Sequence, residues 1–355
     1  MIKFLFVNPF GIGDILFTTP VIKAIKKHHP DAFLGYWCNE RTEPVLRNNP
    51  YIDKIFALSR GDLKKIFRIS KWQGIKRFIK LLWDIKKERF DICLDFSLDS
   101  RYSLITKILK IKKRIGLNYK GRGKFLNHKI DISGYEDKHA VLYYLDLLKF
   151  LNIPVTDKAL DLFLAKEDML KASLVLGELG ILQNDIVIGI APGAGLSWGK
   201  DAGFKHWLPE RFAEICDRLI EDLKAKIIIF GDKSEESISN RIVTLMRNKV
   251  INLTGKTSLA ELAALFSKLS LVICNDGGLL HIAKALKLKT VSIFGPVNEK
   301  VYGPYPLTDR DIVLKAEVSC RPCYKNFRFN GCLNNRRCVE DISTDAVYTA
   351  VRRLM

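Results

Sequence analysis

The sequence lacks any run of 18 uncharged apolar residues, which excludes an ordinary transmembrane helix. It also lacks the shape of a secretory signal peptide, because it begins directly with a strand-like MIKFLFVN. We therefore expect a cytoplasmic protein. Acidic residues are scarce, since 39 Asp and Glu face 58 Lys and Arg for a formal net charge of +19. Such a charge favours polyanionic partners: nucleic acid, an anionic membrane surface or a phosphorylated glycolipid.

Several nucleotide-binding and nucleic-acid-binding motifs are also missing. The sequence contains no Walker A segment, G-x-x-x-x-G-K-[ST], and no G-x-G-x-x-G dinucleotide fingerprint. The missing fingerprint disfavours a two-domain dehydrogenase. An RNP-type aromatic motif and zinc-finger histidine spacing are absent too. A basic nucleic-acid-binding protein, which is the non-enzymatic alternative for this chain, is therefore disfavoured.

A length of 355 residues suggests two domains. Strand-like and helix-like segments alternate in two successive runs, and the second run starts near residue 186. This alternation predicts an α/β protein with two doubly wound, Rossmann-like domains facing a central cleft. We expect the domains at 1–165 and 166–340, with a cysteine-rich tail from residue 320 and a terminal helix within 341–355.

Residues 271–296 form the clearest β-turn-α-β unit of the sequence. An apolar strand at 271–274 is followed by Asn275-Asp276-Gly277-Gly278, a helical pattern and a second strand at 290–294. A helix that begins at the carboxyl end of a parallel strand presents unpaired N–H groups to an anion. This turn therefore predicts an anion site, most simply for a diphosphate. The alternative is a structural turn with Asp276 as the helix cap.

Three other turns follow predicted strands in the same way. The first, Gly11-Ile12-Gly13-Asp14, precedes a helix expected at 15–27, where Asp14 is either functional or an N-cap. The second, at 192–197, contains two glycines and Ser197 and is followed by Lys205, a combination that suits phosphate oxygens. The third carries Glu235, whose carboxylate is suited to ribose hydroxyls or to capping a helix.

Residues 62–89 are basic and amphipathic, with ten Lys and Arg against three acids. Apolar residues including Trp72, Ile79 and Trp83 recur there at helical spacing. The pattern favours a surface helix that turns these residues toward the core. The alternative is a helix that lies on an anionic membrane surface.

Eight cysteines fall into two groups. Four are isolated in apolar segments and are expected to be buried. The other four are Cys320, Cys323, Cys332 and Cys338, and their clustering in a cytosolic chain suggests a metal site before it suggests disulfides. Four thiolates suit zinc or a single iron. Free thiols or a redox pair remain the alternative.

Taken together and in order, these motifs resemble glycosyltransferase family 9, the heptosyltransferases of lipopolysaccharide assembly. The resemblance rests on FGIGDILFTTPVIKAIKKHHP, APGAGLSWGKDAGFKHWLPERFAEICDRL, IFGDKSEE, LTGKTSLAELAALFSKLSLVICNDGGLLHIAKAL and the following FGP. It covers nearly the whole chain. It implies a GT-B fold with the nucleotide-sugar on the C-terminal domain. It also implies that some relatives, those that glycosylate proteins, carry a cysteine-bound iron.

The resemblance also implies residue roles. Asp14 would be the general base that deprotonates the acceptor hydroxyl. Lys205 would bind the donor phosphates, and the backbone at Asp276, Gly277, Gly278, Leu279 and His281 would cradle the diphosphate. Gly277 departs from the family pattern, which has serine or threonine there. Together with Ser197 and Glu235 these residues form the expected donor site.

The resulting hypothesis is an inverting enzyme that transfers heptose from ADP-heptose to the lipid A–Kdo inner core of lipopolysaccharide. No cofactor is expected for catalysis. We expect an acidic glycolipid acceptor and an anionic membrane surface as partners, and no nucleic acid. Acceptor contacts are expected from Gly13, Arg101, Arg122 and Lys124 of the positive N-terminal domain. The alternative within the family uses another nucleotide-sugar or a protein acceptor.

Overall fold

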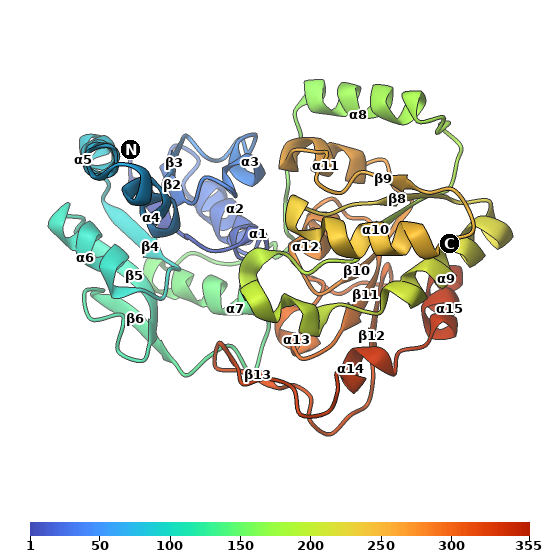
Figure 1. Ribbon diagram of the computed structural model, residues 1–355. Coiled ribbons are helices and arrows are strands. Elements are labelled where there is room, and N and C mark those ends of the chain that lie inside the picture. Colours follow the sequence, from blue (N-terminus) through green and yellow to red (C-terminus); the bar gives the residue numbers. More distant parts are fainter. The chain divides into compact units, whose positions relative to one another are not determined.

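A computed structural model describes the backbone of all 355 residues and every side chain except those of Arg60, Leu196 and Ser197. The chain divides into two compact units, Met1–Phe163 and Leu164–Met355 (Figure 1). Each unit is built on its own six-stranded parallel sheet. The expected α/β fold class with two doubly wound sheets is confirmed.

The first sheet has the strand order β3-β2-β1-β4-β5-β6. All neighbouring strands run parallel. The central strands β1, β2 and β4 are almost entirely buried, as expected for strands covered on both faces. The strands are β1 (Lys3–Val7), β2 (Phe33–Cys38), β3 (Lys54–Ala57), β4 (Ile92–Asp95), β5 (Lys113–Tyr119) and β6 (His128–Ile132).

The helices of the first unit are shorter than predicted. The helix expected at 15–27 is two helices, because Pro20 lacks the N–H that a continuous helix would need and instead occupies the first turn of α2. The basic segment 62–89 is likewise divided at Ser70, which ends α4 and caps α5. The helices are α1 (Ile12–Leu16), α2 (Thr19–His28), α3 (Glu43–Leu46), α4 (Arg60–Ile69), α5 (Lys71–Glu88), α6 (Ser100–Ile108), α7 (Ala140–Leu145) and the 3-10 helix η1 (Asp146–Leu151).

The second sheet has the order β12-β11-β10-β7-β8-β9 and is also parallel throughout. A separate antiparallel hairpin pairs β13 with β14 near the clustered cysteines. The strands are β7 (Val187–Ala191), β8 (Lys226–Ile229), β9 (Ile251–Asn252), β10 (Leu271–Asn275), β11 (Lys289–Phe294), β12 (Asp311–Lys315), β13 (Tyr324–Lys325) and β14 (Arg328–Phe329).

The helices of the second unit include α15, which packs its apolar face against α9 and the sheet of this unit. The helices are α8 (Lys166–Glu178), η2 (Leu196–Lys205), α9 (Pro209–Leu223), η3 (Lys233–Glu235), α10 (Glu236–Leu245), α11 (Leu259–Phe266), α12 (Gly278–Ala285), α13 (Glu299–Tyr302), α14 (Arg337–Glu340) and α15 (Thr344–Leu354).

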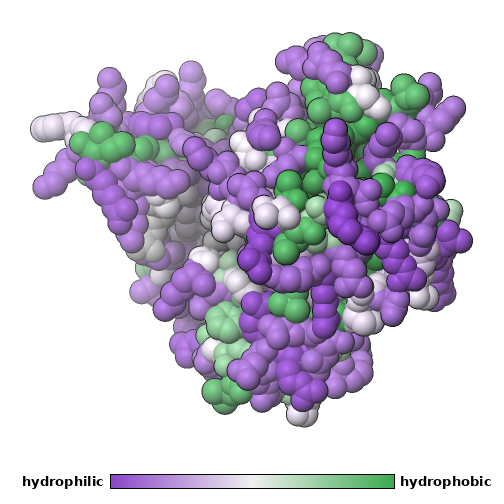
Figure 2. Space-filling model, turned by 45° about the vertical axis from the view of Figure 1, so that its right-hand side comes forward, coloured by the Kyte–Doolittle hydropathy of each residue, from purple (hydrophilic) through white to green (hydrophobic). Residues whose placement is uncertain are grey.

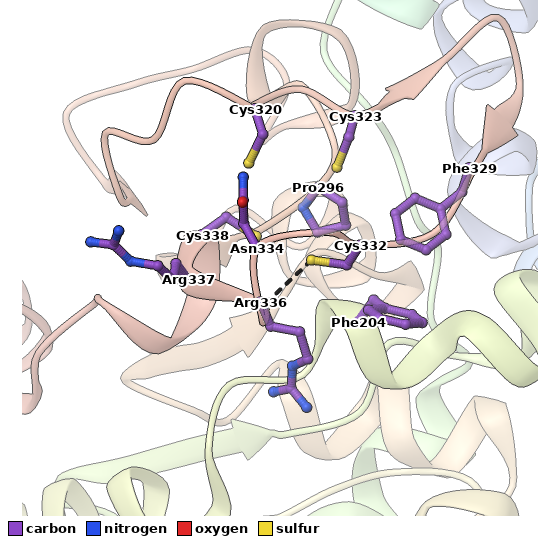
Figure 3. A pocket seen from close by; sticks show the side chains of 10 residues that line it. All are labelled: Phe204, Pro296, Cys320, Cys323, Phe329, Cys332, Asn334, Arg336, Arg337 and Cys338. Carbon is purple, nitrogen blue, oxygen red and sulfur yellow. Dashed lines mark hydrogen bonds between the residues drawn. The ribbon is translucent and has the colours of Figure 1, made fainter.

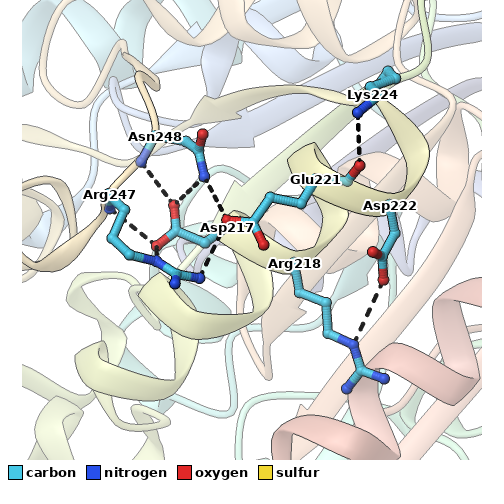
Figure 4. A network of polar contacts seen from close by, with 7 residues as sticks. All are labelled: Asp217, Arg218, Glu221, Asp222, Lys224, Arg247 and Asn248. Carbon is cyan, nitrogen blue, oxygen red and sulfur yellow. Dashed lines mark hydrogen bonds and ion pairs between the residues drawn. The ribbon is translucent and has the colours of Figure 1, made fainter.

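A polar network fixes α9 to the segment that follows α10 (Figure 4). The Asp217 carboxylate accepts hydrogen bonds from the backbone N–H groups of Arg247, at 3.0 Å, and Asn248, at 2.9 Å. Burial acts to raise the pKa of Asp217, but these hydrogen bonds outweigh it and hold the pKa below its usual value. The network therefore secures a connection that has no regular structure of its own.

Each sheet has one point where the strand order reverses. In the first unit it lies between β1 and β4, and in the second between β7 and β10. Open α/β sheets bind ligands at the carboxyl ends of the strands beside this point, because the adjoining loops diverge there. Three of the turns singled out from the sequence follow β1, β7 and β10 and so lie at these two positions, whereas the turn that carries Glu235 follows β8, the neighbour of β7. None of the described helices is long and apolar enough to cross a bilayer.

Candidate functional sites at the strand switch points

In the first unit, the turn after β1 is held by its own side chains. Asn8 accepts a hydrogen bond from the Phe10 N–H at 3.2 Å and donates one to the Asp14 carbonyl oxygen at 3.0 Å. The Gly11 N–H in turn donates to Asp14 Oδ2 at 3.3 Å. Asp14 thus occupies the third position of α1 and satisfies the N–H of the N-cap residue, Gly11. The N-cap residue of α1 is Gly11, so Asp14 is not the N-cap itself; its carboxylate accepts one hydrogen bond from the N-cap backbone and keeps its other oxygen for other contacts.

The Asp14 carboxyl has the electrostatic properties of a proton acceptor. Burial raises its pKa to about 6, against the opposing effect of hydrogen bonding from Gly11, from its own backbone and from the Tyr144 hydroxyl. That hydroxyl is buried and has no hydrogen-bond partner of good geometry among the described residues. A carboxyl with this pKa is largely ionised at pH 7 yet still basic enough to take a proton.

A second buried carboxyl, Asp95, lies at the same edge of the sheet and was missed from the sequence. It is the last residue of β4 and pairs in register with Val7 of β1, directly beside the Asp14 turn. The Ser97 N–H donates to Asp95 Oδ1 at 2.9 Å, and burial raises the pKa of Asp95 to about 6. In the sequence, Asp95 is marked only as an acidic residue at the end of an apolar strand. Its position beside the Asp14 turn follows from the pairing of β4 with β1, which the sequence alone does not reveal.

The residues predicted to bind the acceptor lie in different places in the first unit. Gly13 is in α1, next to Asp14. Arg101 begins α6, which follows β4, and its guanidinium is paired with Asp99. Arg122 and Lys124 are exposed in the loop after β5, where each stacks its charge on a neighbouring aromatic ring. Acceptor binding by these four residues stays a prediction.

In the second unit, Glu235 organises the turn that follows β7. Its Oε1 accepts the Gly195 N–H at 2.9 Å, and its Oε2 accepts the Asp232 N–H at 3.0 Å. A Cβ at Gly193 would lie 1.7 Å from Oε1, so any other residue there would displace the Glu235 carboxylate from its two hydrogen bonds. Burial raises the pKa of Glu235. Both carboxylate oxygens accept backbone hydrogen bonds, and Glu235 helps to cap η3. A contact between Glu235 and a ribose stays a prediction.

Lys205 and Asp276 form a buried ion pair between the two loops at the switch point. Lys205 Nζ lies 2.6 Å from Asp276 Oδ2, and both side chains are almost inaccessible to solvent. The contact lacks hydrogen-bond geometry, since among the described residues this oxygen has no hydrogen-bond partner. A buried charge pair of this kind must be held by its surroundings, because desolvation opposes it. The structure therefore joins two residues that the sequence assigned separately to the donor site.

The N-terminus of α12 lies beside this ion pair. Its N-cap residue is Gly277 and not Asp276, so the alternative role of Asp276 as the cap is wrong. A Cβ at Gly277 would come within 3.3 Å of the Ala194 backbone. This close approach of two loops gives a physical reason for glycine where the family pattern has a hydroxyl residue. Gly277, Gly278 and Leu279 are partly accessible, whereas His281 is buried on the helix.

An aromatic cluster forms one wall beside Lys205. Its ammonium lies 4.9 Å from the ring centroid of Trp198. The ring centroid of Trp198 lies 4.9 Å from that of Tyr324 and 5.0 Å from that of Phe329, and both of these residues belong to the β13–β14 hairpin. Phe204, next to Lys205, contacts Phe329 at 5.0 Å. The hairpin thus supports the loop that carries the predicted phosphate-binding lysine. The side chain of Ser197, also predicted to bind the donor, lies outside the described residues.

The four clustered cysteines line one pocket, together with Phe204 and Phe329 (Figure 3). The Cys323 N–H donates to the Pro296 carbonyl at 3.0 Å, which ties the segment to the loop after β11. Burial raises the pKa of Cys338 to about 11, and the neighbouring thiols add to this rise. Within the described part of the chain, no three His, Cys, Asp or Glu side chains are placed to hold a metal ion. The metal site therefore stays a hypothesis.

The sequence is similar to a known protein family and to curated members of it. Residues 78–333 match the family model described as glycosyltransferase family 9 (heptosyltransferase). Lipooligosaccharide heptosyltransferase 2 of Campylobacter jejuni is 27% identical over 354 residues, covering 98% of this chain and 97% of that protein.

Two solved structures share the fold over almost their whole length. The glycosyl transferase family 9 protein of Veillonella parvula has a TM-score of 0.82 and 24% identity, covering 99% of this chain and 96% of its own. The E. coli ADP-heptose lps heptosyltransferase II has a TM-score of 0.75 and 19% identity, covering 99% and 98%. These likenesses confirm the expected GT-B fold class. The chain is therefore a glycosyltransferase and belongs to glycosyltransferase family 9, the heptosyltransferase family.

Proposed function

We propose that this glycosyltransferase transfers heptose from ADP-heptose to the inner core of lipopolysaccharide, on a lipid A–Kdo acceptor at the cytoplasmic face of the inner membrane. The observation that carries the donor assignment is the meeting of Lys205, Asp276 and the α12 N-terminus at the switch point of the second sheet. The heptose assignment is supported by relatives that are heptosyltransferases, one of them named for ADP-heptose.

In this proposal the second unit binds the donor diphosphate. The unpaired N–H groups from Gly278 onward would face the phosphate oxygens at the positive end of the helix dipole. Lys205 would add a full positive charge, and the Asp276 carboxylate would hold that ammonium in place between turnovers. As the bond from the sugar to the diphosphate breaks, negative charge grows on the departing ADP. Fixed positive groups at that position lower the barrier because they need no reorganisation.

The first unit supplies the base. Asp14 would accept the proton of the acceptor hydroxyl while the hydroxyl oxygen attacks the anomeric carbon and the ADP oxygen leaves. One displacement of this kind inverts the anomeric configuration and needs a single carboxylate, unlike the paired carboxylates of glycoside hydrolysis. The pKa of about 6 keeps Asp14 mostly ionised at neutral pH. The basic side chains Arg101, Arg122 and Lys124 would bind the phosphorylated acceptor.

Donor binding can be tested by thermal shift with ADP-, GDP- and UDP-linked sugars. A ligand that binds only the folded state raises the melting temperature in proportion to the logarithm of its concentration over its dissociation constant. We expect ADP-heptose to give the largest shift, and Lys205→Met to remove most of it. The matched control is Lys200→Met, which neutralises an exposed lysine of the same loop. Equal shifts for wild type and Lys205→Met would reject the phosphate role.

Transfer itself can be tested with ADP-heptose and a lipid A–Kdo acceptor, with the product followed by mass spectrometry. We expect one added heptose of inverted anomeric configuration and almost none with Asp14→Asn. Asp14→Asn should still show the ADP-heptose shift, because the base lies in the other unit. Retained configuration or full activity of the variant would rule out the proposed mechanism.

The clustered cysteines are proposed to hold a structural zinc or iron. Four thiols around one pocket are a donor set that both metals accept. A bound ion would link the cysteine-bearing segments of the tail to one another, beside the Phe204 and Pro296 loops that also line the pocket. The test is metal analysis of protein purified without added metal, alongside Cys320→Ser. We expect close to one ion per chain in wild type and a large loss in the variant. No stoichiometric metal in either protein would dismiss the site.

A further inference from the structure

The helical hairpin of α4 and α5 in the first unit carries two apolar faces. One face of α5 packs inward, where Leu81 and Ile85 join the core beside Phe90. At Gly74 an added Cβ would lie 2.6 Å from the ring of Phe67, so α4 crosses α5 closely at this glycine. Leu63 and Ile66 of α4 and Phe78 of α5 pack against the same core cluster. These contacts do not involve the tryptophans of α5.

The second apolar face of α5 points to solvent. Trp72, Ile75, Ile79 and Trp83 follow each other at spacings of three, four and four residues, so they form one stripe. The centre of the stripe lies about 145° around the helix from Leu81 and Ile85 at 3.6 residues per turn. Trp72 is 82% exposed, Ile79 60% and Trp83 59%. The prediction that these residues face the core is therefore wrong.

The exposed stripe is surrounded by positive charge. Nine Lys and Arg side chains of α4 and α5 are exposed among those described. The Lys87 ammonium lies 5.1 Å from the ring centroid of Trp83. Of the three acids, Asp62 caps α4 and Glu88 pairs with Lys54. In Figure 2, apolar (green) groups at the left of the view, over α4 and α5, are bordered by hydrophilic (purple) ones.

We propose that this stripe and its basic border, Trp72, Ile75, Ile79 and Trp83 with the lysines of α4 and α5, form a docking surface for an anionic lipid bilayer. Tryptophan rings are favoured at the level of the lipid headgroups, and lysine stems can lie along apolar surface while their ammonium groups contact lipid phosphates. A helix that lies in the interface combines these features. A second copy of this chain is disfavoured as the occupant because it would bring the same positive charge to the contact.

The inference rests on the proposed function in one respect, because a membrane-embedded acceptor gives the docking surface its purpose. Docking would place the first unit, which carries Asp14, at the bilayer where the acceptor headgroup emerges. The surface itself can be tested on vesicles that contain no acceptor.

The test is co-sedimentation with vesicles of phosphatidylcholine alone or with added phosphatidylglycerol. We expect wild type to bind the anionic vesicles at least about ten times more tightly than the neutral ones, with binding weakened by salt. The double variant Trp72→Ala/Trp83→Ala should lose about ten-fold in affinity for anionic vesicles. Lys76→Glu/Lys80→Glu should lose the preference for anionic lipid. Because all four side chains are exposed, circular dichroism and melting temperature should not change.

The matched control replaces exposed apolar residues elsewhere. Leu170 and Leu174 of α8 are 67% and 68% exposed, and Leu170→Ala/Leu174→Ala should bind vesicles like wild type. Equal binding by wild type and the tryptophan variant would overturn the proposal. So would a wild-type dimer that the tryptophan variant converts to monomer without any vesicle binding, since the stripe would then contact a second copy.

Activity measurements separate this inference from the proposed function. Transfer to an acceptor dispersed in detergent should be the same for wild type and the tryptophan variant, whereas transfer to acceptor in vesicles should fall in the variant. Vesicle binding without heptose transfer would reject the proposed function and keep the docking surface. Transfer without vesicle binding would do the reverse.

Discussion

The pH dependence of catalysis offers a test of Asp14 that can be worked out from the structure. Burial places the pKa of its carboxyl at about 6. At pH 7 about nine-tenths of the molecules would then carry the ionised base, and at pH 5 about one-tenth. Since only the carboxylate accepts the acceptor proton, kcat/KM should fall about ten-fold between these two pH values, with an inflection near 6.

Asp95 is the necessary control for this experiment. Its carboxyl ends the neighbouring strand and burial also raises its pKa to about 6, so a wild-type profile cannot distinguish the two groups. Asp14→Asn should lower kcat/KM at pH 7 by about 10²- to 10⁴-fold and abolish the inflection. Asp95→Asn should keep the inflection.

The assay is heptose transfer measured from pH 5 to pH 8 at low substrate concentration, for wild type and both variants. The assignment of Asp14 as the base is refuted if the inflection survives in Asp14→Asn. It is equally refuted if only Asp95→Asn removes the inflection, because the titrating base would then be Asp95.

Four further changes test the energetics of individual sites. Burial raises the pKa of Asp95 to about 6, above its unfolded value, so ionisation of this carboxyl opposes folding. In urea unfolding, the stability gained by Asp95→Asn over wild type should therefore grow as pH rises from about 4 to 6 and reach up to about 3 kcal/mol at pH 7. Lys205→Met leaves a buried carboxylate unpaired at the donor site, and should weaken ADP binding at least about ten-fold by calorimetry. Lys284→Met strands the buried Asp311 carboxylate and should lower the free energy of unfolding by about 3–5 kcal/mol in urea titrations, whereas an unchanged midpoint would show that the pair contributes nothing. Gly193→Ala forces its Cβ onto a carboxylate oxygen and should cost about 1–3 kcal/mol of stability, with donor affinity falling in the same protein.

The central strands and the turns after them could be predicted from the sequence because each is a local pattern. β2, β7 and β10 are almost entirely apolar runs, and glycines just after β7 and β10 mark where the chain must turn. The edge strands β3, β6 and β12 were not predicted, because most of their residues are only partly buried and each strand contains at least one charged residue. Such segments become strands through pairing with distant partners, which a local reading does not contain.

The candidate site residues that lie in local sequence patterns could be predicted, and those that depend on strand pairing could not. Asp14 and Lys205 follow glycine-rich turns and could be singled out, whereas Asp95 has no glycine beside it and gains its place only from the pairing of β4 with β1. The tryptophans of α5 show a different limit. Helical spacing identifies an apolar stripe but does not say which of two stripes faces the core. Here Leu81 and Ile85 occupy the core, and Trp72 and Trp83 face solvent.

The aromatic contacts beside Lys205 restrict which substitutions can accumulate at these positions during evolution. Trp198 precedes Lys205, and Tyr324 and Phe329 come from a hairpin more than a hundred positions later, yet their rings form one packed group. A smaller ring at one position would leave a gap that only the others can fill. In sequences descended from a common ancestor, these positions should therefore change together, and exchanging the tail between relatives should fail unless the loop around Trp198 is exchanged with it.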